Sequence, residues 1–258
     1  MRASRPSHLD PQSLAAHTHA RVALGRAGNA LPTQALLRFQ ADHATAKQAV
    51  QTPFDATGLQ HACAALGLPW TPVQTEARSQ DEYLHNPLAG RVLTDSSQRE
   101  LRDLRDEGAP PDIVFVVSGG LSPQGVNVSA GDLLALAVAG LRESGLRVGP
   151  VVVADRARVG VINGIGEALG VRSIAILIGE RPGLTVPDSM GVYFEYRPRT
   201  GLTDADRNCI SNIHAGGLSL PAAAQQLRAL IVAGLAQRTS GVDLQPPVVD
   251  RAVANGNV

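Results

Sequence analysis

Residues 173–183 read SIAILIGERPG and join a strand-like run to the loop that follows it. The run SIAILIG, residues 173–179, is mostly apolar and rich in isoleucine, which is typical of a strand covered on both faces. Glu180 and Arg181 follow at once, and Pro182 fixes one φ angle of a turn that has a glycine at each end. The stretch therefore predicts a buried strand whose C-terminal end carries a rigid, charged turn.

Three more apolar runs in the second half of the chain predict strands. They are DIVFVV at 112–117, GPVVVA at 149–154 and GVYFEY at 191–196. Helical patterns separate the first three strands of the series. Strands that alternate with helices are typical of βαβ units, so we expect an α/β fold with a mainly parallel sheet.

Helix boundaries follow from capping signals. The helix between the first two strands is expected at 132–144, because Ser129 and Asp132 have the spacing of a capping box. The next helix passes through Ile165 and closes at Gly170, since glycine favours the position just after a helix. A last helix is expected from Ser219 or Pro221 to about Gln237.

Ligands of open α/β sheets bind outside the carboxyl ends of the strands. The loops SGGLS (118–122), ADRARVG (154–160) and GERPG (179–183) are expected at that edge. A ligand contact explains the Glu180–Arg181 pair, and a salt-bridged surface turn explains it equally well. Spacing alone leaves both interpretations open.

The N-terminal region, residues 1–105, is expected to be helical with loops. Its clearest helix begins near Thr33 as N-cap and carries Phe39 and His43 on one stripe. A lone histidine on such a stripe is expected in a core or an interface rather than as a metal ligand. The stretch LRDEGAPP at 104–111 marks a boundary with residues 106–258.

Composition excludes several classes of protein. The chain has 258 residues, 23 basic and 23 acidic residues, and 3% aromatic residues. A nucleic-acid binder usually carries a basic excess and stacking aromatics, so no nucleic-acid partner is expected. The cysteines are Cys63 and Cys209, without a CxxC motif, which argues against a disulfide framework or zinc cluster. No apolar leader or membrane-length run is seen, so we expect a cytoplasmic protein without a membrane partner.

Familiar catalytic motifs do not occur. GxGxxG, GxxxxGK[ST], GxSxG and HExxH are all missing, and so is DxHxxG, by which one class of cobalamin proteins supplies a histidine to cobalt. A stand-alone α/β enzyme or nucleotide-binding protein would need one of them. The pattern favours a chain that helps to bind rather than one that reacts alone.

Two short stretches carry a resemblance to a known family. GERPG, and DRNCISNI at 206–213, occur in this order in the small subunit of ethanolamine ammonia-lyase. RVALGRAGNALPTQALLRFQADHATAK (21–47) and EYLHNPLAGRVL (82–93) resemble the same family. The similarity extends from about residue 17 to about residue 243.

The resemblance implies a function for the whole chain. The small subunit pairs with a large barrel subunit that holds the substrate, in a higher-order hetero-oligomer, with residues 1–105 docking the partner. The complex uses adenosylcobalamin to convert ethanolamine to acetaldehyde and ammonia by a radical route. Residues 106–258 then correspond to a Rossmann-like domain that contacts cobalamin. The complex is expected free in the cytoplasm or inside a bacterial microcompartment.

The resemblance also implies three cobalamin contacts, at Val159, Glu180 and Cys209. On pattern alone, Val159 belongs to the core or a helix start, and Cys209 to the core. The family places the cofactor's own base below the cobalt, so no metal ligand, acid or base is expected from this chain. Gly119 and Gln48 stand where many members have aspartate. A structural assembly protein that has lost its cofactor contacts remains the alternative.

Overall fold

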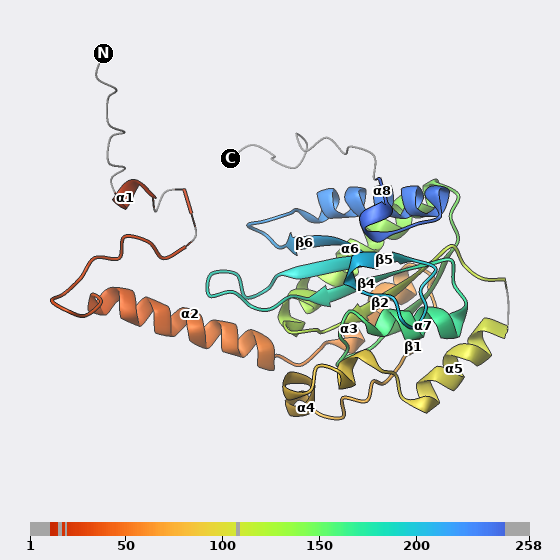
Figure 1. Ribbon diagram of the computed structural model, residues 1–258, viewed down its shortest axis with the longest axis horizontal. Coiled ribbons are helices and arrows are strands. Elements are labelled where there is room, and N and C mark those ends of the chain that lie inside the picture. Colours follow the sequence, from red (N-terminus) through yellow and green to blue (C-terminus); the bar gives the residue numbers. More distant parts are fainter. Residues whose placement is uncertain (1–10, 15–16, 19, 107–108, 246–258) are drawn as a thin grey trace, which may run out of the picture.

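A computed structural model describes residues 11–14, 17–18, 20–106 and 109–245 (Figure 1). Its centre is one six-stranded sheet in the order β1-β3-β2-β4-β5-β6. The strands are β1 (Trp70–Pro72), β2 (Ile113–Ser118), β3 (Val148–Val153), β4 (Ser173–Gly179), β5 (Met190–Tyr196) and β6 (Asn208–Ile213). The α/β class predicted from the sequence is confirmed.

The sheet is mixed, which corrects the expectation of a mainly parallel one. Strands β1, β3, β2 and β4 are parallel neighbours, whereas β5 is antiparallel to β4 and β6 is antiparallel to β5. The reason is the connection after β4. Residues 180–189 form a loop without a helix, and a parallel return needs a longer crossover.

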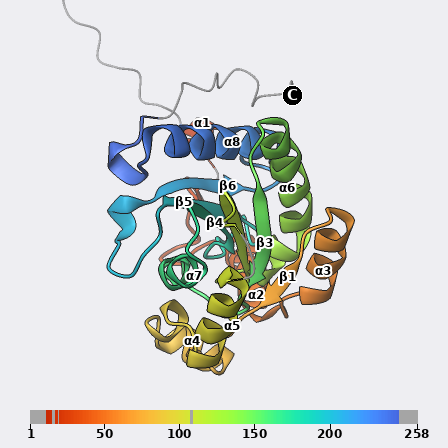
Figure 2. The same cartoon turned by 90° about the vertical axis from the view of Figure 1, so that its right-hand side faces the viewer.

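Helices cover both faces of the sheet (Figure 2). One face carries α3 (Ala56–Ala65), α6 (Pro123–Glu143) and α8 (Leu220–Gln237); the other carries α5 (Asp95–Asp106) and α7 (Val161–Leu169). The remaining helices are α1 (Pro11–Leu14), α2 (Thr33–Gln51), α4 (Gln80–His85) and the short 3₁₀ turns Ala89–Arg91, Asp204–Asp206 and Gly241–Asp243.

Strands β2 and β4 are buried along their whole length, as their continuous apolar runs predict. Their side chains alternate between the two layers. In β2, Phe115 and Val117 face α6 and α8, while Val114 and Val116 face α7. This double burial holds their C-terminal ends, and the loops that follow, in fixed positions.

Helix α6 begins nine residues earlier than predicted, at Pro123 rather than at residue 132. Ser122 caps it by accepting a hydrogen bond from Gly125 N–H, and Pro123 suits the first turn. Ser129 and Asp132 lie inside the helix, so the predicted capping box is wrong. By length and composition α6 resembles a membrane span, but its apolar face packs on the sheet and α8.

The N-terminal region adds a strand as well as helices. Strand β1, which was not predicted, pairs with β3 at one edge of the sheet. Helix α2 extends away from the rest of the molecule (Figure 1), and only Ala49 in it is buried. His43 is exposed and stacks on the Phe39 ring at 6.1 Å, so it has no core role. Thr33 is the first helical residue, and Pro32 holds the N-cap position.

Candidate functional site

The three loops predicted at the carboxyl edge of the sheet do meet there. Leu121 N–H donates to the Gly179 carbonyl at 3.0 Å, joining the loop after β2 to the loop after β4. The buried Ser118 hydroxyl bonds the Asp155 carbonyl at 3.0 Å and accepts from Ala157 N–H at 3.2 Å, joining the loop after β3. One serine and one backbone contact thus connect all three loops.

Glycines make this close crossing possible. A Cβ on Gly120, whose φ is +59°, would overlap the backbone of Gly179, and a Cβ on Gly179 would overlap Gly119 and Ser122. Backbone packing therefore explains Gly120 of SGGLS and Gly179 of IGERPG. At Gly119 itself a Cβ would lie 3.2 Å from Pro123, so an aspartate there requires its neighbours to move.

A hollow of about 320 Å³ lies over the joined loops. Two of the three predicted contact residues, Val159 and Glu180, line it. The other lining residues are Tyr83, Leu121, Arg158, Ile178, Gly179, Arg181 and Tyr193. The walls are therefore partly apolar, with two arginines and one carboxylate at their edge.

The Glu180 carboxylate is fixed by its neighbours after β4. Ser189 Oγ donates to it at 2.6 Å, and Asn212 N–H lies 3.3 and 3.4 Å from its two oxygens. Arg181 is exposed. Among the described residues, the ion pairs formed by arginines include neither Arg181 nor Glu180, so these two side chains are not paired. The interpretation of GERPG as a salt-bridged turn is therefore wrong.

A β-bulge brings the Asn212 N–H to Glu180. The pairing of β5 with β6 shifts between Met190–Ile213 and Val192–Ile210, so β6 has an extra residue there. Asn212 takes a left-handed backbone, with φ of +59°, which asparagine tolerates better than most residues. Bulges of this kind redirect groups beside functional sites.

Cys209, the third predicted residue, lies one strand further along. It pairs directly with Tyr193 across the sheet. Cys209 is exposed, so its pattern-based assignment to the core is wrong. Desolvation raises the pKa of its thiol, and burial likewise raises the pKa of Tyr193, so both groups are neutral at physiological pH.

The three predicted residues thus border one surface. Val159 and Glu180 line the hollow with Tyr193, and Cys209 continues it across the open face of β6. Sequence reasoning missed Tyr83, Arg158, Ser189, Tyr193 and Asn212. Arg158 and Tyr193 stood inside predicted loop and strand segments, whereas the others reach the site through tertiary contacts that no local pattern shows.

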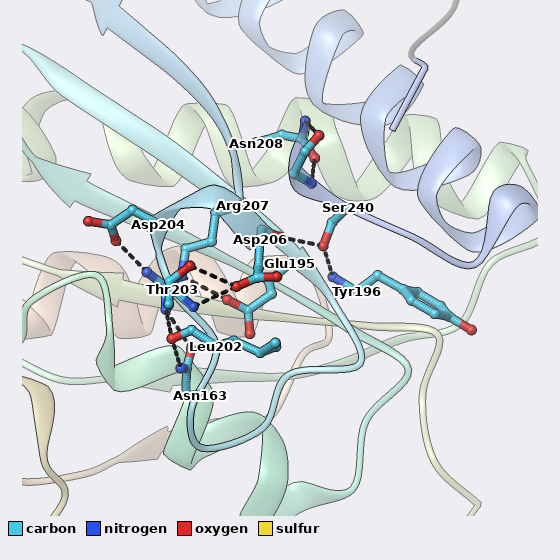
Figure 3. Close-up of polar contacts among 11 residues, drawn as sticks. Asn163, Glu195, Tyr196, Leu202, Thr203, Asp204, Asp206, Arg207, Asn208 and Ser240 are labelled. Carbon is cyan, nitrogen blue, oxygen red and sulfur yellow. Dashed lines mark hydrogen bonds and ion pairs between the residues drawn. The ribbon is translucent and has the colours of Figure 1, made fainter. Parts of the chain in front are cut away.

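A buried polar cluster positions the start of β6 (Figure 3). Arg207 donates to Glu195 at 2.7 Å, to Asp204 at 2.5 Å and to Asn163 at 2.7 Å. Its side chain is 4% exposed and that of Glu195 is 0% exposed. Burial raises the pKa of Glu195 to about 7, although Arg207 opposes the rise. The cluster fixes the chain two residues before Cys209.

A larger hollow, of about 770 Å³, lies between α5, α7 and the loop 200–204. Two of its charged side chains have partners within the chain. Arg207 is bound as described, and the Glu167 carboxylate accepts from Thr200. None of the three predicted contact residues lines this larger hollow, whereas Val159 and Glu180 line the smaller one over the loops. We therefore take the smaller hollow as the candidate site. Within the described residues, no group of three His, Cys, Asp or Glu side chains could hold a metal ion.

Comparison of the sequence with known proteins points to a single family. The family described as "Ethanolamine ammonia-lyase light chain (EutC)" matches residues 10–245. The chain is 46% identical over 228 residues to an ethanolamine ammonia-lyase small subunit of Rhodopseudomonas palustris, with 88% of this chain and 87% of the relative covered. It is 45% identical over 237 residues to a protein of the same name from Ralstonia nicotianae, with 91% and 87% covered.

The chain is also similar to an ethanolamine ammonia-lyase small subunit of Azotobacter vinelandii. The two are 45% identical over 235 residues, and the match covers 91% of this chain and 87% of the relative. The matched residues include every element of the sheet and all three loops at its carboxyl edge. The chain therefore belongs to the ethanolamine ammonia-lyase light-chain family, whose members are subunits of a carbon–nitrogen lyase.

Proposed function

We propose that this chain is the small subunit of an adenosylcobalamin-dependent ethanolamine ammonia-lyase, and that it forms one wall of the cofactor site. The large subunit holds the substrate. When bound, adenosylcobalamin supplies the radical chemistry by which ethanolamine becomes acetaldehyde and ammonia. The residues of this chain bind and orient the cofactor, and none of them acts as a catalytic acid or base.

One observation carries the proposal. Val159, Glu180 and Cys209 lie far apart in the sequence, yet Val159 and Glu180 line one hollow at the carboxyl edge of the sheet, and Cys209 pairs with Tyr193, which lines the same hollow. These are the three positions that the family resemblance assigns to cobalamin contact. A structural assembly protein would have no need to bring them together.

The chemistry of this surface fits a corrinoid, which is a flat ring edged with amide side chains. Leu121, Val159 and Ile178 offer apolar contact. Glu180 offers acceptor oxygens, which Ser189 and Asn212 already hold in place. A fixed acceptor loses little conformational entropy on binding. The exposed Cys209 thiol is small and polarizable and suits packing against a flat face.

The division of labour along the chain is part of the same proposal. The parallel strands β2, β3 and β4 form the Rossmann-like part of residues 106–258, and β1 from the N-terminal region completes this sheet at one edge. Residues 106–258 contact cobalamin, and residues 1–105 dock the large subunit within a higher-order hetero-oligomer.

Residues 20–51, here called the N-terminal arm, are the docking element. Arg21 pairs with Asp42 and lies 5.2 Å from the centre of the Phe39 ring, so the segment before α2 folds back on the helix. Five large apolar side chains of the arm are exposed: Leu24, Leu31, Leu36, Leu37 and Phe39. A helix that packs only at its C-terminal end gains little from the rest of its own chain. A partner that covers these side chains explains both features.

Helix α6 offers little apolar surface for docking, although its sequence is apolar. Leu133, Leu134, Val138 and Leu141 are all buried in the core of this chain. Its exposed apolar residues, Val128 and Leu136, are few. The arm, rather than this helix, therefore offers the apolar surface for the large subunit.

The direct test is to co-express this chain with the large subunit and to measure acetaldehyde release from ethanolamine during an adenosylcobalamin titration. Saturable, cofactor-dependent release that disappears without this chain supports the proposal. A well-folded pair that neither binds cobalamin nor releases acetaldehyde contradicts it. Unchanged cobalamin affinity in a Glu180→Ala complex would instead favour the structural assembly role.

A further inference from the structure

Arg158 stands out among the residues that line the hollow. It lies on the loop between β3 and α7, next to Val159, and its guanidinium is held rigidly. The guanidinium carbon is 4.2 Å from the centre of the Tyr83 ring, and Nη2 donates to the Tyr83 carbonyl at 2.9 Å. Its backbone N–H donates to the Gly90 carbonyl at 2.7 Å.

The donors of this guanidinium are only partly used. Nε is buried and has no hydrogen-bond partner among the described residues. Nη1 also has no partner there, but unlike Nε it is not buried. Arg158 takes part in none of the ion pairs of the described residues. A fixed cation with unused donors at the wall of a hollow is suited to an acceptor from outside the chain.

Neighbouring residues restrict the position of the Arg158 side chain. Tyr83 is 1% exposed, and its hydroxyl donates to the Ala157 carbonyl at 3.1 Å, so the ring under the guanidinium cannot move freely. Gly90 allows the close approach, because a Cβ at that position would lie 2.9 Å from Arg158 Cγ. The N-terminal region thus supports the position of this side chain.

We propose that Arg158 is a cofactor-binding residue that donates a hydrogen bond to an acceptor oxygen at the edge of the bound cobalamin. This inference rests on the proposed function and adds a fourth contact to the three expected ones. Glu180 and Arg158 line the same hollow and have opposite character, one an acceptor and the other a donor. A carboxamide group carries both a donor and an acceptor, so the pair is complementary to the amide-edged ring. The phosphate of the nucleotide tail offers the same acceptor chemistry.

The test is the dissociation constant of adenosylcobalamin, measured by absorbance titration of the assembled two-subunit complex without substrate. Arg158→Lys keeps the charge but loses the planar fork, and we expect about tenfold weaker binding or more. Gly90→Ala displaces the guanidinium without changing its charge and should also weaken binding several-fold. Arg156→Lys is the matched control: it lies on the same loop, does not line the hollow, and should change the constant less than about twofold.

A second titration with cobinamide, which lacks the nucleotide phosphate, identifies the acceptor. Equal weakening for both corrinoids assigns Arg158 to a ring amide, and weakening for cobalamin alone assigns it to the phosphate. Wild-type affinity in Arg158→Lys and Gly90→Ala, with weaker binding in Glu180→Ala, would overturn this inference and leave the proposed function standing. A wild-type complex that binds no cobalamin would overturn both. Size-exclusion chromatography of each variant checks that the complex assembles.

Discussion

Glu180 shows how single residues prepare this site. Its carboxylate lies at the C-terminal end of a fully buried strand, where a charge can face the hollow without entering the core. The Ser189 hydroxyl and the Asn212 N–H hold it, and neither residue is adjacent to it in the sequence. The position of the acceptor therefore depends on three segments at once.

Replacing Ser189 with alanine tests this arrangement. The change removes the 2.6 Å hydrogen bond to Glu180 Oε2 and frees the carboxylate to rotate. We expect about fivefold weaker adenosylcobalamin binding by the assembled complex, which corresponds to one hydrogen bond of about 1 kcal/mol. Equilibrium dialysis gives the constant, with Ser96→Ala, on the distant helix α5, as the control. Equal affinity in both variants would show that Ser189 does not position Glu180.

Glu195 predicts a pH dependence of stability. Burial raises its pKa from 4.5 to about 7, so the folded chain holds a proton that the unfolded chain releases between these values. The protonated carboxyl thus adds to the free energy of unfolding, by at most about 3 kcal/mol. This stabilisation is complete below about pH 4.5 and is lost as the pH rises through 7. The charges that act on Glu195 are Arg207, Asp206 and Arg199.

Urea unfolding at pH 5, 6, 7 and 8 measures this effect. The free energy of unfolding of the wild-type chain should fall over the range more steeply than that of Glu195→Gln, which cannot titrate. Asp206 and Glu167 have lowered pKa values and change their charge below this window, so they do not mask the difference. Parallel curves for the two proteins would refute the assignment to Glu195.

The residues of the site were predictable to different degrees. Glu180 could be placed at the edge of the sheet because an apolar run and a turn flank it directly. Ser189 and Asn212 could not, because their contacts depend on a β-bulge and on the antiparallel return of β5. Val159 and Cys209 entered only through resemblance to a family, since their own patterns indicate core positions.

At the scale of elements, helix α7 packs closely against the loop after β5. Gly166 faces this loop, where a Cβ would overlap the Pro198 ring, whereas a Cβ on Gly164 would lie 3.9 Å from its nearest neighbour, Leu93. The two glycines lie in the same helix but have different surroundings, so one can serve as the control for the other.

We expect Gly166→Ala to destabilise the chain by about 1–3 kcal/mol through overpacking. Gly164→Ala should be neutral or should stabilise by up to about 1 kcal/mol, because alanine is the better helix former. Thermal unfolding of both variants checks the pair. If they have the same stability, the contact between α7 and the loop is looser than the structure indicates.

The N-terminal arm gives a prediction about assembly. Leu37 is 58% exposed in the arm, and replacing it with glutamate puts a charge in the proposed interface. We expect Leu37→Glu to abolish or strongly weaken binding to the large subunit, while the fold of the free chain stays intact. Val242→Glu, at a position that is 84% exposed outside the arm, should assemble normally. Analytical ultracentrifugation of the two mixtures distinguishes the outcomes.

The elements themselves were predicted best where burial dictates the sequence. Strand β4 has the predicted bounds, and β2, β3 and β5 differ by one residue, because full burial demands continuous apolar runs. Strands β1 and β6 were missed: β1 has three residues, and β6 reads NCISNI, with polar side chains on its exposed face. The start of α6 was placed late because Ser129 resembles a cap in a helix that Ser122 already caps.

At the scale of the whole molecule, the chain is a sheet with two helical layers and one arm. The N-terminal region supports the site as well as extending from it. Thr75 donates to the Arg156 carbonyl, Tyr83 donates to the Ala157 carbonyl, and Gly90 accepts from Arg158. The residues that support the loop before α7 thus follow the arm in the sequence and are not part of it.

If this chain forms one wall of the cobalamin site, the bound cofactor must lie against it. A cryo-electron microscopy map of the assembled complex with adenosylcobalamin shows whether it does. We expect corrin density over the hollow, in contact with Val159, Glu180 and Cys209. Density for the cofactor that is enclosed by the large subunit alone, away from these three residues, would contradict it.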